Sequence, residues 1–155
     1  MNMKLTIQER KMFADLTKKY LQDERVRSMN HYIQHGSVTT LQHCIMVAET
    51  GFLLNRRLHL GANEESLVGA ALLHDFYLYD WHEKSDDHKL HGFTHARKAA
   101  ENARRCFAIN QQEYRAINSH MWPLTLTKLP VSRIGWILCV ADKYCAMKET
   151  IFHRR

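Results

Sequence analysis

Apolar residues recur at intervals of three and four along most of the chain, which is the spacing of amphipathic helices with one buried face. The first such stripe follows Thr6 and Glu9, which fit the pattern of a capping box. Asn63 and Asn110 stand at equivalent starting positions later in the chain. The spacing predicts an all-α fold with no strand, in which the helices cover about 6–20, 25–32, 38–52, 63–76, 94–107, 110–121 and 131–145.

Two of these helices carry a carboxylate after a strongly apolar run. The segment SLVGAALLHDF is apolar on nearly every side and ends in His74 and Asp75, so this helix should be central and buried. The segment VSRIGWILCVADKYCAM sets Asp142 against the apolar side of the last helix. A buried carboxylate is costly unless it is paired, protonated or bound to a metal. Two such carboxylates in a chain with several histidines indicate one shared cation.

His43 lies beside the apolar stripe of helix 38–52 and is a further candidate ligand. Imidazole and carboxylate groups bind Mn, Fe, Zn or Ni, and such a set can leave a position open at which water is activated. Adjacent residues of a helix point about 100° apart, so His74 and Asp75 can share an ion only near a helix end or with favourable rotamers. Taken singly, His43 could be a satisfied helix histidine and Asp142 the partner of an Arg or Lys. Their joint presence favours a metal site.

The composition indicates one domain. A chain of 155 residues, 45% hydrophobic and 25% charged, is long enough for one core. Four cysteines fall singly in apolar stretches and the chain starts without the apolar run of a signal peptide, so we expect reduced thiols and a cytoplasmic location without membrane attachment. The net charge of +6 suits a small anionic substrate. The basic residues are scattered along the chain and form no continuous stripe, which argues against binding of a nucleic acid polymer. The pattern leaves the oligomeric state open.

The order of the candidate ligands resembles that of a known family. His43, then His74 with Asp75, then Asp142 span about a hundred residues, as do the ligands of the HD superfamily of metal-dependent phosphohydrolases. Small apolar residues lead into LLHD, and the last aspartate stands in VADK, which is similar to the family pattern. The resemblance implies a single HD domain over 1–155, built as a bundle of about six or seven helices, with a metal-binding core at about 36–150.

Members of that family that bind two metals have two further histidines, and this chain offers His95 and His120 for them. By the resemblance, one ion would be held by His43, His74 and Asp142. The other would be held by His95 and His120, with Asp75 as the bridge. The cofactor would then be one or two divalent transition-metal ions, and the ligand types suit Fe, Mn, Ni, Zn or Co.

His91 is an alternative to His95. The two histidines are four residues apart and would share a face if the helix extended back over Gly92. The alanine pattern after His95 resembles the family helix more closely, so we expect His95 to be the ligand. His91 is then an alternative ligand, or a residue that contacts one of the metal ligands without binding the metal itself.

The resemblance implies the hydrolysis of a phosphate ester or anhydride of a small molecule such as a nucleotide, by metal-activated water, with Asp75 as a catalytic residue. The residue after Asp142, Lys143, is either a surface residue or a second catalytic residue, and we favour the second. Lys143 is a candidate phosphate contact beside Asp142. Arg97 and Lys98 would lie at a helix N-terminus, where anions bind readily, so they are either substrate contacts or solvated surface charges. Trp122 opens the loop 122–130 near the site and is a further candidate substrate contact, although packing within the loop is the commoner role of such an aromatic residue.

Two other functions remain compatible with these residues. Relatives of the HD fold with a two-iron site act as oxygenases, and six candidate ligands suit that chemistry as well. A nucleotide-binding regulatory module without turnover is the third reading, although the presence of all the candidate ligands argues against a degenerate site.

Overall fold

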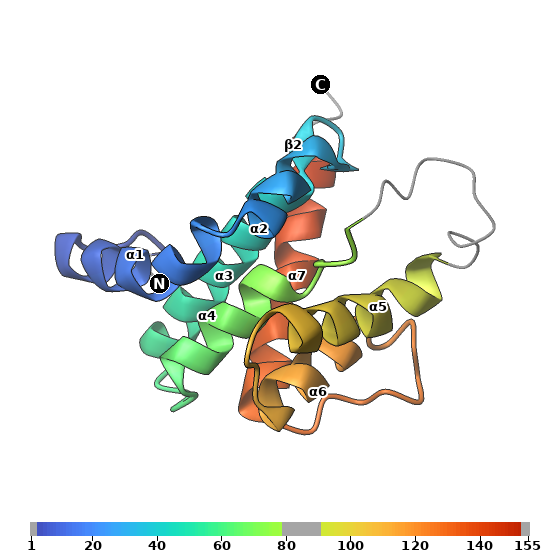
Figure 1. Cartoon of the computed structure of the whole chain (residues 1–155). Coiled ribbons are helices and arrows are strands. Elements are labelled where there is room, and N and C mark those ends of the chain that lie inside the picture. The colour runs from blue at the N-terminus through green and yellow to red at the C-terminus, as the bar shows by residue number, and fades with distance from the viewer. Residues whose placement is uncertain (1–2, 79–90, 153–155) are drawn as a thin grey trace.

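The computed structural model describes residues 3–78 and 91–152, with the backbone alone for 91–93 and 152. It confirms the all-α prediction, because seven α-helices dominate the described chain (Figure 1). The helices are α1 (Ile7–Leu21), α2 (Glu24–Ser28), α3 (Thr40–Arg57), α4 (Glu64–Leu73), α5 (His91–Cys106), α6 (Gln111–Ser119) and α7 (Arg133–Phe152), and a short 3₁₀ turn, η1, covers Met29–His31.

The predicted helix starts at Thr6, Asn63 and Asn110 are confirmed. The Thr6 side chain accepts a bond from the Glu9 amide and the Glu9 carboxylate accepts one from the Thr6 amide, so α1 begins with a complete capping box. Asn110 forms the same reciprocal pair with Glu113 at α6, and Asn63 caps α4 through the amide of Ser66. These bonds satisfy backbone donors that the helix itself leaves unpaired.

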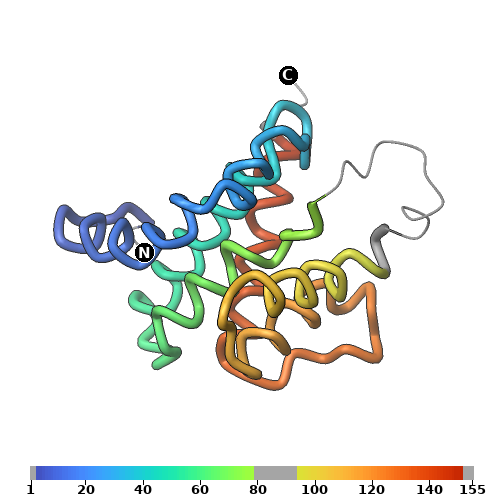
Figure 2. The backbone as a smooth tube through the Cα atoms, in the orientation of Figure 1, coloured from blue at the N-terminus to red at the C-terminus, as the bar shows by residue number. Residues whose placement is uncertain are grey.

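Helix α4 is central, as its sequence predicts. Every residue from Ser66 to Leu73 is buried, and α4 packs against α1, α3, α5, α6 and α7. Helices α3 and α7 lie side by side against it, with α1 on one flank and the pair α5 and α6 on the other (Figure 2). Gly51 of α3 faces α7, where an added Cβ would make ordinary van der Waals contact with Ile137 and Ala141.

The prediction that the chain has no strand is wrong at one place. Strand β1 (Ile33–His35) pairs antiparallel with β2 (Val38–Thr39), and the two are joined by Gly36 and Ser37. Gly36 has φ 58°, which a glycine adopts without strain, and Gly-Ser between two short runs is a known hairpin signal. The hairpin matters for the site, because it sets Gln34 beside the end of α4.

Three helix starts differ from the prediction. Helix α3 begins at Thr40, because Val38 belongs to β2. Helix α5 begins at His91, so Thr94 is not its N-cap. Gly92 is tolerated there, since its backbone penalty of roughly 1 kcal/mol is small beside the packing of the buried alanines at 96, 99, 100 and 103. Helix α7 begins at Arg133, and Val131 is 71% exposed outside it, while Ile134 and Leu138 are buried as expected.

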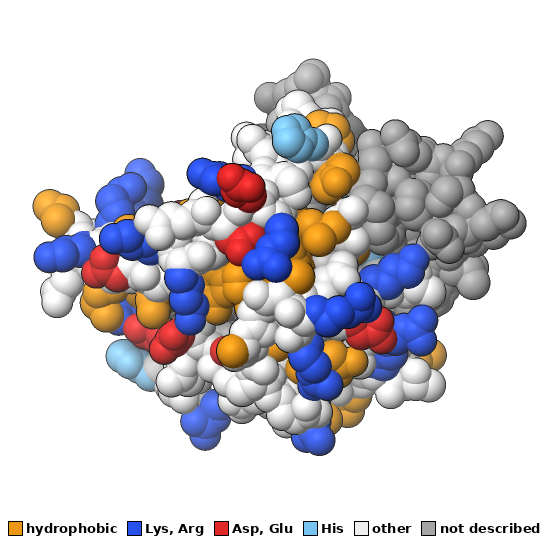
Figure 3. Space-filling view, viewed as in Figure 1, with side chains coloured by type: hydrophobic (Ala, Val, Ile, Leu, Met, Phe, Trp, Pro, Cys, Tyr) orange, Lys and Arg blue, Asp and Glu red, His pale blue; other side chains and the backbone are white. Residues whose placement is uncertain are grey.

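The surface shows no single basic stripe on the face drawn in Figure 3, where Lys and Arg side chains are spread over several elements with acidic side chains among them. The four cysteines are free, in agreement with the expectation of reduced thiols. Within the described residues, no helix has both the length and the apolar character that crossing a membrane requires.

Candidate metal centre

His43 and Asp142 meet across the contact between α3 and α7. Thr39 caps α3 and forms a capping box with Gln42, so His43 sits in the first turn of a well-anchored helix. Its side chain is fully buried, and its Nε2 lies 3.1 Å from Oδ1 of Asp142. The helix packing therefore brings together a histidine and an aspartate that are 99 positions apart in the sequence.

His74 and Asp75 follow the last residue of α4, Leu73. Nδ1 of His74 lies 2.7 Å from the carbonyl oxygen of Ala71, so this nitrogen carries the proton and donates it. Nε2 of His74 is buried without a hydrogen-bond partner and lies 3.4 Å from Oδ2 of Asp75. The predicted requirement that the helix stop at this dipeptide is met, because the chain leaves the helix here and lets both side chains face one point.

His120 repeats this arrangement at the end of α6. It is the C-cap residue, and its Nδ1 donates to the carbonyl oxygen of Ile117 at 2.7 Å. Its Nε2 lies 3.1 Å from Nε2 of His95 on α5. Both histidines are buried, so two further imidazole nitrogens enter the same interior space.

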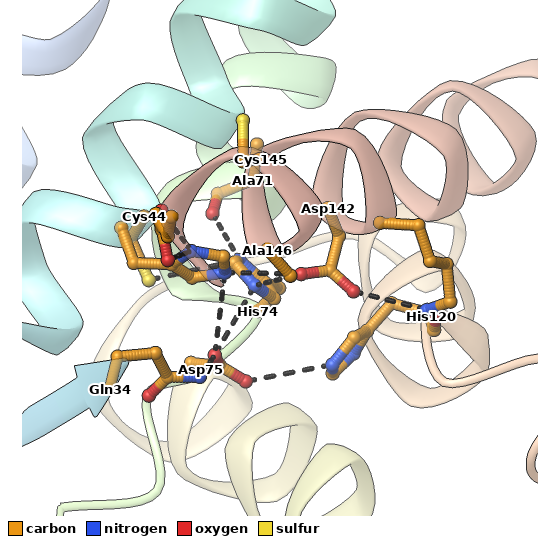
Figure 4. A network of polar contacts seen from close by, with 12 residues as sticks. Gln34, Cys44, Ala71, His74, Asp75, His120, Asp142, Cys145 and Ala146 are labelled. Atoms are coloured by element: carbon orange, nitrogen blue, oxygen red, sulfur yellow. Dashed lines mark hydrogen bonds and ion pairs between the residues drawn. The ribbon is translucent and has the colours of Figure 1, made fainter. Parts of the chain in front are cut away.

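The carboxylate of Asp75 divides its two oxygens between the two pairs of histidines. Oδ2 lies 3.4 Å from His74 Nε2 and 3.9 Å from His43 Nε2. Oδ1 lies 3.3 Å from His95 Nε2 and 3.5 Å from His120 Nε2. Figure 4 shows His74, Asp75, His120 and Asp142 converging on one space between the helices. This is the arrangement that a bridging carboxylate needs.

The electrostatics of the cluster depend on charges that balance each other. Burial alone would lower the pKa of His43, but its bonds to Asp142 and Glu149 outweigh burial and raise that pKa to about 10. Burial would raise the pKa of Asp75 and of Asp142, yet the neighbouring histidines hold both pKa values well below the usual range. The carboxylates are thus ionised, as metal ligands must be.

His120 differs from His43 because burial dominates. Its surroundings lower its pKa to about 4, although the Asp75 carboxylate acts in the opposite direction. His120 is therefore neutral near pH 7, the form in which an imidazole nitrogen binds a metal. Burial and the neighbouring His43 also lower the pKa of His35, whose ring centroid is 5.8 Å from that of His43.

These residues fit one or two divalent ions. Three groups of buried side chains have ligand atoms within 4.8 Å of one another: His43, His74 and Asp75; His74, His120 and Asp142; and Asp75, His95 and His120. Asp75 Oδ1 and His74 Nε2 are buried without hydrogen bonds, a situation that is costly unless another group satisfies them. Nitrogen and oxygen donors of this kind suit divalent transition metals.

Lys143 lies at the edge of the cluster. Its Nζ donates to the carbonyl oxygen of His120 at 2.7 Å and to Oδ2 of Asp142 at 3.1 Å. The side chain is 42% exposed, so its ammonium stands between the buried carboxylate and the surface. Lys143 thus links the end of α6 to the middle of α7 as well as facing the site.

The structure bears on which of His91 and His95 is the metal ligand. Helix α5 does extend over Gly92, so the two histidines are one turn apart on the same helix. The side chain of His91 lies outside the described residues. His95 is the residue whose Nε2 reaches both His120 and Asp75.

The three candidate substrate contacts are not part of the cluster. Arg97 and Lys98 lie in the second turn of α5, because the helix begins earlier than predicted, so the argument for an anion site at its N-terminus does not apply to them. Arg97 pairs with Glu101 at 3.9 Å on its own helix. Trp122 packs against Trp136, with ring centroids 5.2 Å apart.

Two residues of the site were not predicted from the sequence. Glu149, on α7, has its carboxylate 2.8 Å from Nδ1 of His43. Its spacing of seven from Asp142 places both on one face of the helix, and this spacing was an available signal. Gln34 donates from β1 to Oδ2 of Asp75 at 2.6 Å, visible in Figure 4, and no pattern in the sequence pointed to it once the hairpin was missed.

The comparisons with known proteins give one match. A family model described as the HD domain matches residues 40–147, well over half of the chain. The matched segment contains all six residues of the cluster. No curated protein and no solved structure matches the chain.

Proposed function

The chain belongs to the HD domain family, and on that basis we propose that it is a metal-dependent phosphohydrolase that cleaves a phosphate ester or anhydride of a small molecule. The observation that carries the proposal is the position of the Asp75 carboxylate, whose two oxygens face two separate pairs of histidines. A carboxylate placed in this way can bridge two ions that lie close together, which is a common arrangement in enzymes that hydrolyse phosphate esters.

We assign the ligands as the sequence suggested. His43, His74 and Asp142 would hold one divalent ion, and His95 and His120 the other, with Asp75 shared between them. A divalent ion held by these residues would lower the pKa of a coordinated water and would supply positive charge to a phosphoryl oxygen. The metal remains one of Fe, Mn, Ni, Zn or Co, because this set of nitrogen and oxygen donors suits all of them.

The protein side chains prepare the site in two ways. The bonds from Nδ1 of His74 and of His120 to backbone carbonyls fix the orientation of each ring and leave Nε2 as the nitrogen that faces the cluster. Because the cluster is buried, its charges act with little screening by water. The geometry is therefore set before any ligand arrives, and preorganisation of this kind is a large contribution to catalysis.

Lys143 is the residue that we propose for contact with the substrate phosphate. Its ammonium is partly exposed and lies within hydrogen-bond distance of Asp142, so an anion that reaches the cluster would meet a positive charge. The net charge of +6 favours anionic substrates in general. We propose a nucleotide or another small phosphorylated metabolite as the substrate.

The experiment is a metal analysis of the purified protein, followed by assays with the metal that it contains. Phosphate release from a panel of nucleotides and sugar phosphates, abolished by a chelator and restored by the same metal, would support the proposal. Iron content with oxygen consumption and no phosphate release would contradict it in favour of an oxygenase. Tight nucleotide binding without turnover would contradict it in favour of a regulatory module.

A further inference from the structure

Glu149 is a buried carboxylate that the proposed ligand set does not use. It lies near the end of α7, two helical turns after Asp142, and is 5% exposed. Oε1 and Oε2 lie 2.8 and 3.1 Å from Nδ1 of His43. A carboxylate at this depth requires a compensating partner. The imidazole of His43 is that partner.

The two nitrogens of His43 face opposite ways. Nδ1 points to Glu149, and Nε2 points to Asp142 at 3.1 Å and to Asp75 at 3.9 Å. An ionised carboxylate only accepts hydrogen bonds, so Nδ1 must carry a proton in this contact. Nε2 is then the nitrogen that can bind a metal, once the proton that it shares with Asp142 has left. Helix α7 thus supplies one carboxylate on each side of the same imidazole ring.

His43 is held more strongly than its neighbours in the cluster. His74 and His120 donate Nδ1–H to neutral backbone carbonyls within their own helices. His43 donates to a charged oxygen that belongs to a different helix, and hydrogen bonds to charged groups are roughly twice as strong as neutral ones. A charged acceptor also makes the opposite nitrogen a better electron donor to a metal.

From this geometry we infer that Glu149 is a positioning residue for metal binding: it orients His43, fixes its tautomer and strengthens Nε2 as a ligand for the ion at His43, His74 and Asp142. The inference rests on the proposed metal site and adds a residue to it. Glu149 does not touch the ion or the substrate in this account. It acts through His43.

The test compares the Co²⁺ affinity of metal-free wild-type protein with that of Glu149→Ala and Glu149→Gln, by titration against a competing chelator. Loss of the acceptor in Glu149→Ala should weaken binding by roughly 10- to 100-fold. Glu149→Gln keeps an oxygen that accepts a hydrogen bond from Nδ1 of His43 but removes the charge. Its affinity for Co²⁺ should therefore lie between those of wild type and Glu149→Ala. If Glu149 only filled space, Glu149→Gln, which has the same shape, would bind Co²⁺ as tightly as wild type.

Glu49 provides the matched control. It lies on α3 and lines the same surface pocket, of about 210 Å³, as Glu149. Glu49→Ala and Glu49→Gln should bind Co²⁺ as tightly as wild type. Circular dichroism and the melting temperature of each metal-free variant report separately on folding.

Each outcome decides the inference. Wild-type affinity in both Glu149 variants would overturn it. If Glu149→Ala does not fold, Glu149→Gln alone decides: weaker Co²⁺ binding supports the role, and unchanged binding overturns it. A wild-type protein that takes up no Co²⁺ would contradict the proposed metal site itself, and this inference with it, before any variant is compared.

Discussion

His74 and Asp75 are adjacent in the chain and still face one point, with His74 Nε2 3.4 Å from Asp75 Oδ2. In the middle of a helix their side chains would diverge by about 100°. They converge because α4 ends at Leu73, so Asp75 lies outside the regular helix. The same holds for His120, which stands at the C-cap of α6, whereas His95 lies within α5. Helix ends, and not helix faces, build half of this site.

Removal of one histidine should empty one metal position and leave the other. His95 belongs to the group formed with Asp75 and His120 and to neither of the other two groups. In His95→Ala we therefore expect the metal-to-protein ratio to fall from about two to about one. Elemental analysis after dialysis measures this ratio. His31→Ala, an exposed histidine, is the control, and an unchanged ratio in His95→Ala would argue against a second position.

Metal binding should release protons, and its affinity should rise with pH. The pKa of His43 is about 10 in the metal-free protein, so this imidazole is protonated at pH 7 and must lose a proton to expose Nε2. The affinity increases as pH rises toward 10 because less of that proton remains to be displaced. His120, with its pKa near 4, is already neutral at pH 7 and adds no proton.

The proton release can be measured by calorimetry of metal binding in buffers with different ionisation enthalpies at pH 7. The expected value is about one proton or more for each ion bound at the His43 position. A binding heat that is independent of the buffer would contradict the assignment of His43 as a ligand.

Gln34 should stabilise the metal-free fold through Tyr77. Its Oε1 accepts from the Tyr77 hydroxyl at 2.8 Å and from Thr40 at 3.2 Å, and its amide donates to Asp75 at 2.6 Å. Tyr77 is buried, so we expect Gln34→Ala to lower the free energy of unfolding by about 1–3 kcal/mol. Urea titration of the metal-free protein measures the change.

A double variant checks that this effect passes through the hydrogen bond. Gln34→Ala leaves the Tyr77 hydroxyl without its Oε1 acceptor, and Tyr77→Phe removes that hydroxyl. The double variant should therefore lose less stability than the sum of the losses in the two single variants. Strict additivity would show that the two residues do not interact.

Glu9 should make stability sensitive to acid. Its pKa is lowered from about 4.5 to about 2, first by the bond from Arg57 and then by the Thr6 amide at the capping box. The contribution is complete above pH 4.5 and is lost as pH falls toward 2. The melting temperature of wild type should therefore exceed that of Glu9→Gln at pH 6, and the gap should narrow at pH 3. A constant gap between wild type and Glu9→Gln at the two pH values would contradict the assignment.

Much of the fold and most of the cluster could be predicted from local sequence signals. Asn63, Asn110 and their partners mark helix starts because capping acts over three residues. His74 and Asp75 stand out because a polar pair at the end of a fully apolar run needs a reason. The order of the ligands along the chain then resembled a family, and the family match agrees with it.

The features that the sequence does not predict depend on contacts between segments that are far apart in the chain. Gln34 reaches Asp75 only because a two-residue turn folds β1 back, and short hairpins have weak periodicity. Glu149 meets His43 across 106 positions of sequence, so its partner could not be read from its own helix. The start of α5 at His91 was missed because Gly92 resembles a boundary until the packing of the alanine face is known.

The most direct test of the account is the metal content and phosphohydrolase activity of Asp75→Asn beside wild type, measured on the same preparations. Asparagine keeps the shape of the side chain but removes the charge that both positions share. We predict a wild-type protein with bound divalent metal that releases phosphate, and a folded Asp75→Asn variant that has lost both the metal and the activity. Full metal content and full activity in Asp75→Asn would contradict the central role of this carboxylate.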